Sequence, residues 1–231
     1  MVGRAAIIIG AAGAIGCALA DTLEDRQTFD LVHRLGRSTE PAMDLTDEAS
    51  IARTAGTFAT MAIKPELIIV ATGLLHRDGK GPEKGLKDID PAWTLLNYQV
   101  NALGPALVAK HFLPLMPKDR LIRFAALSAR VGSISDNELG GWYSYRASKA
   151  GLNMMIRNIA IEWKRKNPQS VIVGLHPGTV VSPLSAPFKG NPAHERSPPD
   201  KSATRLLDVL EKLEPSQSGG LFAYDGQHIA P

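Results

Sequence analysis

The sequence predicts an α/β fold: a single-domain, doubly wound parallel sheet with helices on both faces, in three αβα layers. Short apolar runs rich in β-branched residues recur along the chain, and several are apolar almost throughout, which is typical of strands buried on both faces. Segments with helical spacing of apolar residues lie between these runs, and such an alternation builds a parallel sheet. We expect strands at residues 5–9, 31–35, 67–71, 121–127, 171–175 and 221–224.

Three of the predicted helices carry their own boundary signals. The first covers about residues 91–113, begins with the N-cap and proline of Asp90-Pro91, and is expected to kink at Pro105. The second covers about residues 143–166 and ends before an Asn-Pro pair. The last begins near Pro199 and carries leucines at helical spacing.

Length and composition indicate one globular domain. The chain has 231 residues, of which 44% are hydrophobic and 21% charged, so we treat residues 1–231 as one domain with a large core. The single cysteine, Cys17, excludes an intramolecular disulfide, and the six scattered histidines predict no metal site. The net charge of +3 is too weak to predict a nucleic-acid partner.

The apolar segment 5–20 follows Arg4 and imitates a signal peptide. It is short for a membrane span, and its many glycines and alanines are a poor composition for a signal. We interpret it instead as the first strand, which turns through glycines into the first helix. The expectation is therefore a cytoplasmic protein with no membrane partner.

Three glycines, Gly10, Gly13 and Gly16, separate the first strand from the first helix. In a dinucleotide-binding loop one glycine allows the tight turn, one lets the backbone approach a pyrophosphate, and one lets helix and strand pack closely. The helix N-terminus adds free N–H groups and a partial positive charge. The position of these glycines after a first strand favours a Rossmann-like, NAD(P)-binding domain over a merely structural turn.

The end of the second strand predicts which nicotinamide cofactor is bound. An acidic residue there would accept hydrogen bonds from the ribose of NAD. The sequence instead has Arg37 and Ser38, which can bind the 2′-phosphate of NADP. We predict NADP, with NAD as the alternative and a solvated loop position as the other interpretation of Arg37.

Tyr145 and Lys149 are four residues apart in a predicted helix and so share one face. A tyrosine with a pKa of about 10 is a poor acid or base at neutral pH. A lysine ammonium beside it stabilises the phenolate and lowers that pKa. Such a tyrosine can protonate a carbonyl oxygen as hydride arrives, or deprotonate an alcohol in the reverse direction.

Four motifs together resemble the short-chain dehydrogenase/reductase family. They are the glycine loop, Asn101 in Val-Asn-Ala-Leu-Gly, the run Tyr145-Arg-Ala-Ser-Lys149, and His176-Pro177-Gly178, and they follow the family's order along essentially the whole chain. Residues 132–146 are further similar to the C-factor-like and sniffer-type carbonyl reductases.

The resemblance implies a role for each matching residue. Tyr145 is the general acid/base, Lys149 lowers its pKa and binds the nicotinamide ribose, and Asn101 holds a water in a proton relay. Asp44 matches the position that hydrogen-bonds the adenine, and an N-cap of the next helix is a compatible role for it. The cofactor-binding residues expected in all, besides Tyr145 and Lys149, are Gly10, Gly13, Ile15, Gly16, Arg37, Ser38, Asp44, Leu45, Ala71, Thr72, Gly73, Pro177, Gly178, Val180 and Ser182.

Two departures from the family's pattern affect the site. The usual Asn-Asn-Ala-Gly reads Val70-Ala71-Thr72-Gly73, so we expect backbone or water contacts there. The family's substrate-orienting serine falls in register with Ala129, one residue after Ser128. We predict that Ser128 serves in its place, with Ser133 from the following loop as the alternative.

The predicted function is that of an NADP-dependent oxidoreductase acting on a small-molecule carbonyl or alcohol. The alternative is a dinucleotide-binding signalling or sensor protein of the C-factor type, with little or no turnover. The proline-rich segment 179–199 is expected to cover the substrate. The resemblance also implies a homodimer or homotetramer that pairs through the two long helices.

Overall fold

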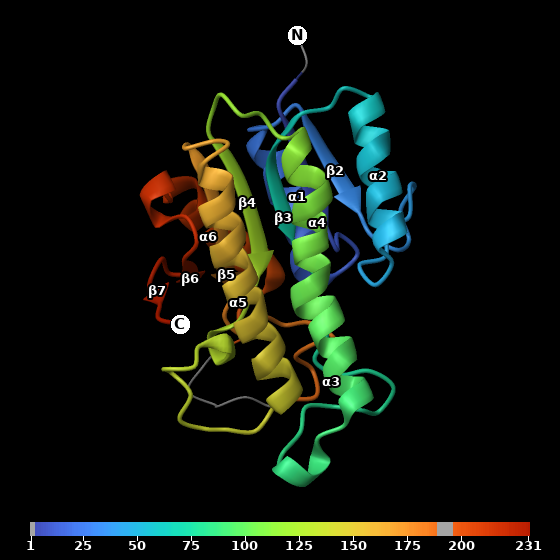
Figure 1. The fold of residues 1–231 in the computed structure, drawn as a ribbon, viewed down its shortest axis with the longest axis vertical. Coiled ribbons are helices and arrows are strands. Elements are labelled where there is room, and N and C mark those ends of the chain that lie inside the picture. Colours follow the sequence, from blue (N-terminus) through green and yellow to red (C-terminus); the bar gives the residue numbers. More distant parts are fainter. Residues whose placement is uncertain (1–2, 189–195) are drawn as a thin grey trace.

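The computed structural model describes residues 3–188 and 196–231. In this part of the chain one seven-stranded sheet has the order β2-β1-β3-β4-β5-β6-β7, parallel except for the last strand (Figure 1). The strands are β1 (Ala5–Ile9), β2 (Leu31–Leu35), β3 (Pro65–Val70), β4 (Ile122–Leu127), β5 (Ser170–His176), β6 (Leu221–Ala223) and β7 (His228–Ile229).

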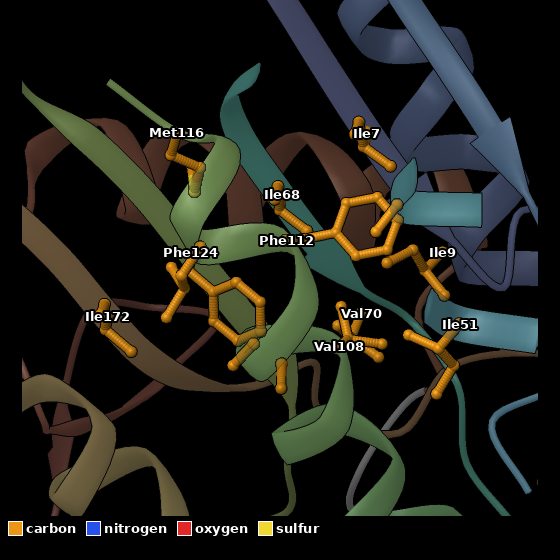
Figure 2. Close-up of a cluster of buried hydrophobic side chains, with 14 of the residues drawn as sticks. Ile7, Ile9, Ile51, Ile68, Val70, Val108, Phe112, Met116, Phe124 and Ile172 are labelled. Atoms are coloured by element: carbon orange, nitrogen blue, oxygen red, sulfur yellow. The ribbon is translucent and has the colours of Figure 1, made fainter. Parts of the chain in front are cut away.

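Helices cover both faces of this sheet, as the sequence predicted (Figure 1). They are α1 (Ala14–Arg26), α2 (Glu48–Thr60), α3 (Pro91–Tyr98), α4 (Gly104–Phe112), α5 (Tyr143–Lys164) and α6 (Pro199–Lys212). The side chains of α2, α4 and α5 join one buried apolar cluster, and those of α1 and α6 join another on the opposite face. Figure 2 shows the first cluster, where Phe112 of α4 packs among isoleucines and valines of the strands.

The predicted strands agree closely with the observed ones. β1 and β2 match end for end, and the other four differ by one or two residues. β7 was not predicted, because two residues are too few to show an alternating pattern, and it pairs antiparallel at the edge of the sheet. Among the described residues no helix is both long and apolar enough to span a membrane.

The kink expected at Pro105 is a π-helical segment, Gln99–Leu103, between α3 and α4. Proline has no N–H to donate to the carbonyl of Asn101 four residues earlier. The Gly104 N–H instead bonds to the Gln99 carbonyl, five residues earlier. Such π-bulges often mark functional positions, and this one contains Asn101.

The strand order also locates a crevice. β1 lies between β2 and β3, so the chain leaves β1 toward one side of the sheet and later returns on the other. In open α/β sheets ligands bind at the carboxyl ends of the strands beside such a switch point. The glycine loop directly follows β1 at this place.

Candidate active site

The glycine loop leaves no room for side chains. Gly10 has a φ of +86°, and a Cβ on it would lie 2.8 Å from the Thr72 methyl carbon. A Cβ on Gly16 would lie 2.2 Å from the Gly10 carbonyl oxygen, so only glycine lets α1 approach the strand end this closely. Gly13 is the N-cap of α1 and has no capping side chain. The first N–H groups of α1 therefore remain available to an anion.

A cleft of about 870 Å³ opens from this loop along the switch point. Many of the predicted cofactor-binding residues line it, namely Gly10, Gly13, Arg37, Ser38, Asp44, Leu45, Ala71, Thr72 and Gly73. Gly16 lies behind the loop against Gly10, and the Ile15 side chain packs toward the core on the α1 side. The structure thus brings most of the set together around one elongated cavity.

Charged groups concentrate at one end of the cleft. Arg37 and Arg77 both line it, and no side chain among the described residues pairs with either guanidinium. The pKa of Asp44 is held below its usual value, mainly by the Thr46 backbone N–H, with the charges of Arg37 and Arg77 adding to the effect. Sequence reasoning missed Arg77, although a basic residue shortly after the carboxyl end of a strand was a signal that could have found it.

Asp44 does not cap the next helix, so that part of the interpretation was wrong. The N-cap of α2 is Asp47, whose carboxylate accepts a hydrogen bond from the Ala49 N–H at 2.9 Å. Asp44 accepts from the backbone and the hydroxyl of Thr46, both at 2.8 Å. This local turn holds the Asp44 carboxylate at the wall of the cleft.

Thr72 adds a polar group that the prediction of backbone or water contacts left out. Its hydroxyl oxygen is buried and finds no hydrogen-bond partner among the described residues. Thr72 lines the cleft next to Gly10. An unpartnered hydroxyl is unfavourable unless a ligand completes its hydrogen bonds, so the group fits a bound cofactor.

Tyr145 and Lys149 are both buried, and the Lys149 nitrogen lies close to Gly73 of the cleft. The Lys149 ammonium donates to the Leu127 carbonyl at 2.7 Å and lies 5.7 Å from the centre of the Tyr145 ring. Burial raises the pKa of Tyr145 to about 12 and lowers the pKa of Lys149 to about 7. Burial is the cause of both shifts, and the predicted lowering of the tyrosine pKa by Lys149 stays a prediction.

Asn101 connects the cleft to this pair. Its carbonyl oxygen accepts the Leu74 N–H at 2.7 Å, and its amide donates to the Leu74 carbonyl at 2.8 Å and to the Ser148 hydroxyl at 3.0 Å. A Cβ on Gly73 would lie 3.8 Å from the Asn101 oxygen and 4.0 Å from the Lys149 nitrogen. The Asn101 side chain is thus committed to holding the backbone after β3, so a water in a relay would need another of its atoms.

Both predicted serines make hydrogen bonds to residues other than Tyr145. The Ser128 hydroxyl donates to Asn153 at 2.6 Å, and Asn153 is eight residues after Tyr145, about 12 Å along a helix. The Ser133 hydroxyl accepts from the Asp136 N–H at 3.1 Å within its own loop. Ala129 is the residue of this strand end that packs with Tyr145. The one-residue register places alanine, and not Ser128, on the side of the reacting group.

The surroundings of Tyr145 are apolar and aromatic. Leu75 and Ala129 share its buried cluster, and Trp142 and Phe188 pack against it. The Trp142 ring is 6.1 Å from Tyr145 and 5.2 Å from Phe188. Phe188 belongs to the predicted substrate cover, of which residues 189–195 lie outside the described residues.

The predicted cofactor-binding residues after β5, Pro177, Gly178, Val180 and Ser182, are not among the described residues that line the cleft. A Cβ on Gly178, where φ is +74°, would lie 2.9 Å from the Tyr224 ring, so Tyr224 explains this glycine. Val180 is buried and bridges to Ser197, and the Ser182 hydroxyl bonds to the Val180 carbonyl at 3.3 Å. Pro177 accepts from Ser202 of α6 at 3.2 Å.

Fold, glycine loop and Tyr-Lys pair together define an oxidoreductase of the short-chain dehydrogenase/reductase class. The family model described as "Enoyl-(Acyl carrier protein) reductase" matches residues 7–206. The chain therefore belongs to the short-chain dehydrogenase/reductase family.

Two curated relatives show how far the similarity extends. The C-signal protein of Myxococcus xanthus is 36% identical over 144 residues, which are 62% of this chain and 82% of that protein. The 1-hydroxy-2-glutathionyl-2-methyl-3-butene dehydrogenase of Rhodococcus sp. (strain AD45) is 31% identical over 196 residues, 84% of this chain and 80% of that protein.

Solved structures share the fold over the full chain. The NADPH-bound carbonyl reductase from chicken fatty liver has a TM-score of 0.84 at 22% identity, with 100% of both chains covered. The carbonyl reductase Sniffer of D. melanogaster has a TM-score of 0.77 at 19% identity, also covering 100% of both chains.

Proposed function

We propose that this chain transfers a hydride between NADPH and a small-molecule carbonyl or alcohol, with Tyr145 as general acid/base. The observation that carries the proposal is the approach of Lys149 and Asn101 to Gly73, which joins the buried Tyr-Lys pair to the cleft. NADPH, when bound, supplies the hydride. The structurally similar carbonyl reductase from chicken fatty liver is described with NADPH bound, which is consistent with this cofactor.

The residues present fit such a cofactor. The glycine loop and the start of α1 would hold the pyrophosphate, and Arg37 with Ser38 would hold the 2′-phosphate. Asp44 would accept from the adenine amino group, and the unpartnered Thr72 hydroxyl would gain a partner. Contacts from the segment 177–182 to the nicotinamide remain predictions.

The raised pKa of Tyr145, about 12, keeps the phenol protonated at neutral pH and suits it to donate a proton to a carbonyl oxygen. The phenolate left behind is an anion beside Lys149, and an anion favours the ammonium form of a lysine whose pKa is about 7. The phenol is therefore in the form that donates a proton during reduction, whereas oxidation of an alcohol would first need its deprotonation.

Tyr145→Phe tests the proposal. We expect kcat for NADPH-dependent reduction of benzaldehyde, or of the best substrate in a carbonyl panel, to fall by about a thousandfold. The Kd for NADPH should stay within about twofold, since the hydroxyl is the only group removed. An unchanged kcat would refute the role of Tyr145.

A second candidate is a dinucleotide-binding signalling or sensor protein with little or no turnover. It is favoured by Ala129 at the expected serine position and by the apolar side chains that pack over Tyr145. Similarity to a protein named C-signal points the same way. Saturable NADPH binding with no NADPH oxidation by any carbonyl compound would favour this function over the first.

We also propose pairing of two copies through α3 and α5. Large apolar side chains are exposed there, with Leu95 70%, Met154 61% and Ile161 48% accessible. Such exposure is typical of a face covered in an oligomer. Sedimentation of the chain as a monomer at micromolar concentration would contradict the pairing.

A further inference from the structure

Glu83 is a buried carboxylate that the proposed reaction does not use. It is only 4% exposed and lies in the segment between β3 and α3. Within the described ranges no lysine, arginine or histidine forms an ion pair with it, and its carboxylate bonds only to Ser144. Burying a carboxylate without a cation is costly, so its place needs a compensating interaction.

That interaction is the start of α5. One carboxylate oxygen of Glu83 accepts the Ser144 N–H at 3.1 Å, and the other accepts the Ser144 hydroxyl. The Glu83 carbonyl accepts the Trp142 N–H at 2.6 Å. Ser144 is the second residue of α5, so its N–H has no acceptor within the helix. Glu83 thus acts as an N-cap from a distant segment, and the positive end of α5 offsets its charge.

Helix α5 needs a cap from another segment because the residue at its own N-cap position packs against aromatic side chains instead. Trp142 stands there with a φ of +51° and makes no side-chain cap. Gly140 and Gly141, each with a φ of +63°, lead the chain into it. The left-handed approach turns the indole toward Tyr145 and Phe188. A side chain in this cluster cannot also accept a hydrogen bond from the helix N-terminus.

We propose that Glu83 is a positioning residue that holds Tyr145 at the reaction site by capping α5. Tyr145 directly follows Ser144, so the two bonds to Ser144 hold the turn that carries the phenol. The segment that Glu83 closes begins at Leu74, which Asn101 holds, and includes Leu75 of the Tyr145 cluster. The segment from Leu74 to Glu83 is therefore held at each end by a buried polar side chain, Asn101 at the start and Glu83 at the end. This inference rests on the proposed role of Tyr145.

Two substitutions at Glu83 test the inference. Glu83→Ala removes both acceptors, whereas Glu83→Gln keeps an amide oxygen for the Ser144 N–H. The matched control is Glu162→Gln, which removes an exposed carboxylate from the same helix. We expect Glu83→Ala to lower kcat for benzaldehyde reduction by about ten- to a hundredfold, with KM for NADPH within about twofold. Glu83→Gln should recover most of kcat.

Amide hydrogen exchange at Ser144 and Tyr145 gives a readout that does not depend on turnover. We expect faster exchange in Glu83→Ala and nearly unchanged exchange in Glu83→Gln. If the unaltered protein shows no turnover, the proposed function fails, while the exchange rates still decide whether Glu83 holds this turn.

Wild-type kcat and exchange in folded Glu83→Ala would overturn the inference. So would a kcat loss that Glu83→Gln does not recover. If Glu83→Ala does not fold, Ser144→Ala replaces it, because that change keeps the N–H and removes only the hydroxyl, which contacts Glu83 and, at 2.8 Å, the Thr94 hydroxyl. The expected loss of kcat is then several-fold, and an unchanged kcat would again count against Glu83.

Discussion

The cleft and the surroundings of Tyr145 are neighbouring regions that differ in how openly they are packed and in whether their polar groups have hydrogen-bond partners. The cleft is open, walled by glycines and backbone, and its arginines and the Thr72 hydroxyl have no partners in the described chain. Around Tyr145 the space is filled by apolar side chains, and the polar groups are engaged with one another, as in Lys149 with Leu127 and Ser128 with Asn153. The proposed cofactor site is thus open, whereas the proposed reaction site is closely packed, and no hydrogen bond to the Tyr145 hydroxyl is found within the described residues.

Because of this difference, we expect substitutions in the two regions to affect different quantities. Changes in the cleft should act mainly on nucleotide affinity, because its groups await a ligand. Changes near Tyr145 should act mainly on kcat or on stability, because its groups hold the protein together. Each prediction below tests that division.

The largest effect is expected at the glycine loop. Gly16→Ala places a Cβ 2.2 Å from the Gly10 carbonyl oxygen, so the backbone must move. We expect loss of measurable NADPH binding and a loss of about 1–3 kcal/mol of stability, seen by calorimetry and by urea unfolding. The control is Gly56→Ala in α2, where a Cβ meets nothing within 4 Å. It should be neutral or stabilising by about 0.5–1 kcal/mol, and NADPH binding by Gly16→Ala would break the comparison.

Lys149→Met should abolish turnover and change how stability depends on pH. The pKa of Lys149 falls on folding from 10.5 to about 7, so between these values the unfolded chain binds more protons and stability rises with pH. Above about pH 10 the raised pKa of Tyr145 acts in the opposite sense. Urea unfolding from about pH 7 to about pH 10 should show a steeper gain for the unaltered protein than for Lys149→Met. Parallel curves would mean that Lys149 is not desolvated.

Arg37 and Arg77 should make the cleft bind NADPH, whose adenosine carries a 2′-phosphate, more tightly than NADH, whose adenosine does not. Arg37→Ala and Arg77→Ala should each weaken NADPH binding by about tenfold, as expected for a charge-assisted hydrogen bond. NADH binding should change by less than about twofold. Equal losses for both nucleotides in one variant would place that arginine at the pyrophosphate instead.

The smallest effect is expected at the missing hydroxyl. Ala129→Ser returns a hydroxyl to the residue that packs with Tyr145, and we expect a gain of about three- to tenfold in kcat/KM for benzaldehyde. Ser128→Ala and Ser133→Ala, the matched controls, should change kcat/KM by less than about threefold. A large loss in Ser128→Ala would support the serine that the sequence predicts, and a large loss in Ser133→Ala would support the alternative.

Local patterns predicted the fold well because they report local physics. The apolar runs of β1 and β2 identified these strands end for end, and Asp90-Pro91 marked the start of α3. Pro105 predicted an interruption at the right place, since the missing N–H is a property of one residue. The form of that interruption, a π segment around Asn101, depends on packing and was not predicted.

The sequence by itself determined six of the strands, the glycine loop and the Tyr145–Lys149 pair, because each depends on neighbours within about one helical turn or one strand. Only the tertiary structure decided the rest: Arg77 beside Asp44, the orientation of Ser128 toward Asn153, and the capping of α5 by Glu83. These contacts join segments far apart in the chain. Their geometry is set by how helices and strands pack, which no short-range spacing of residues records.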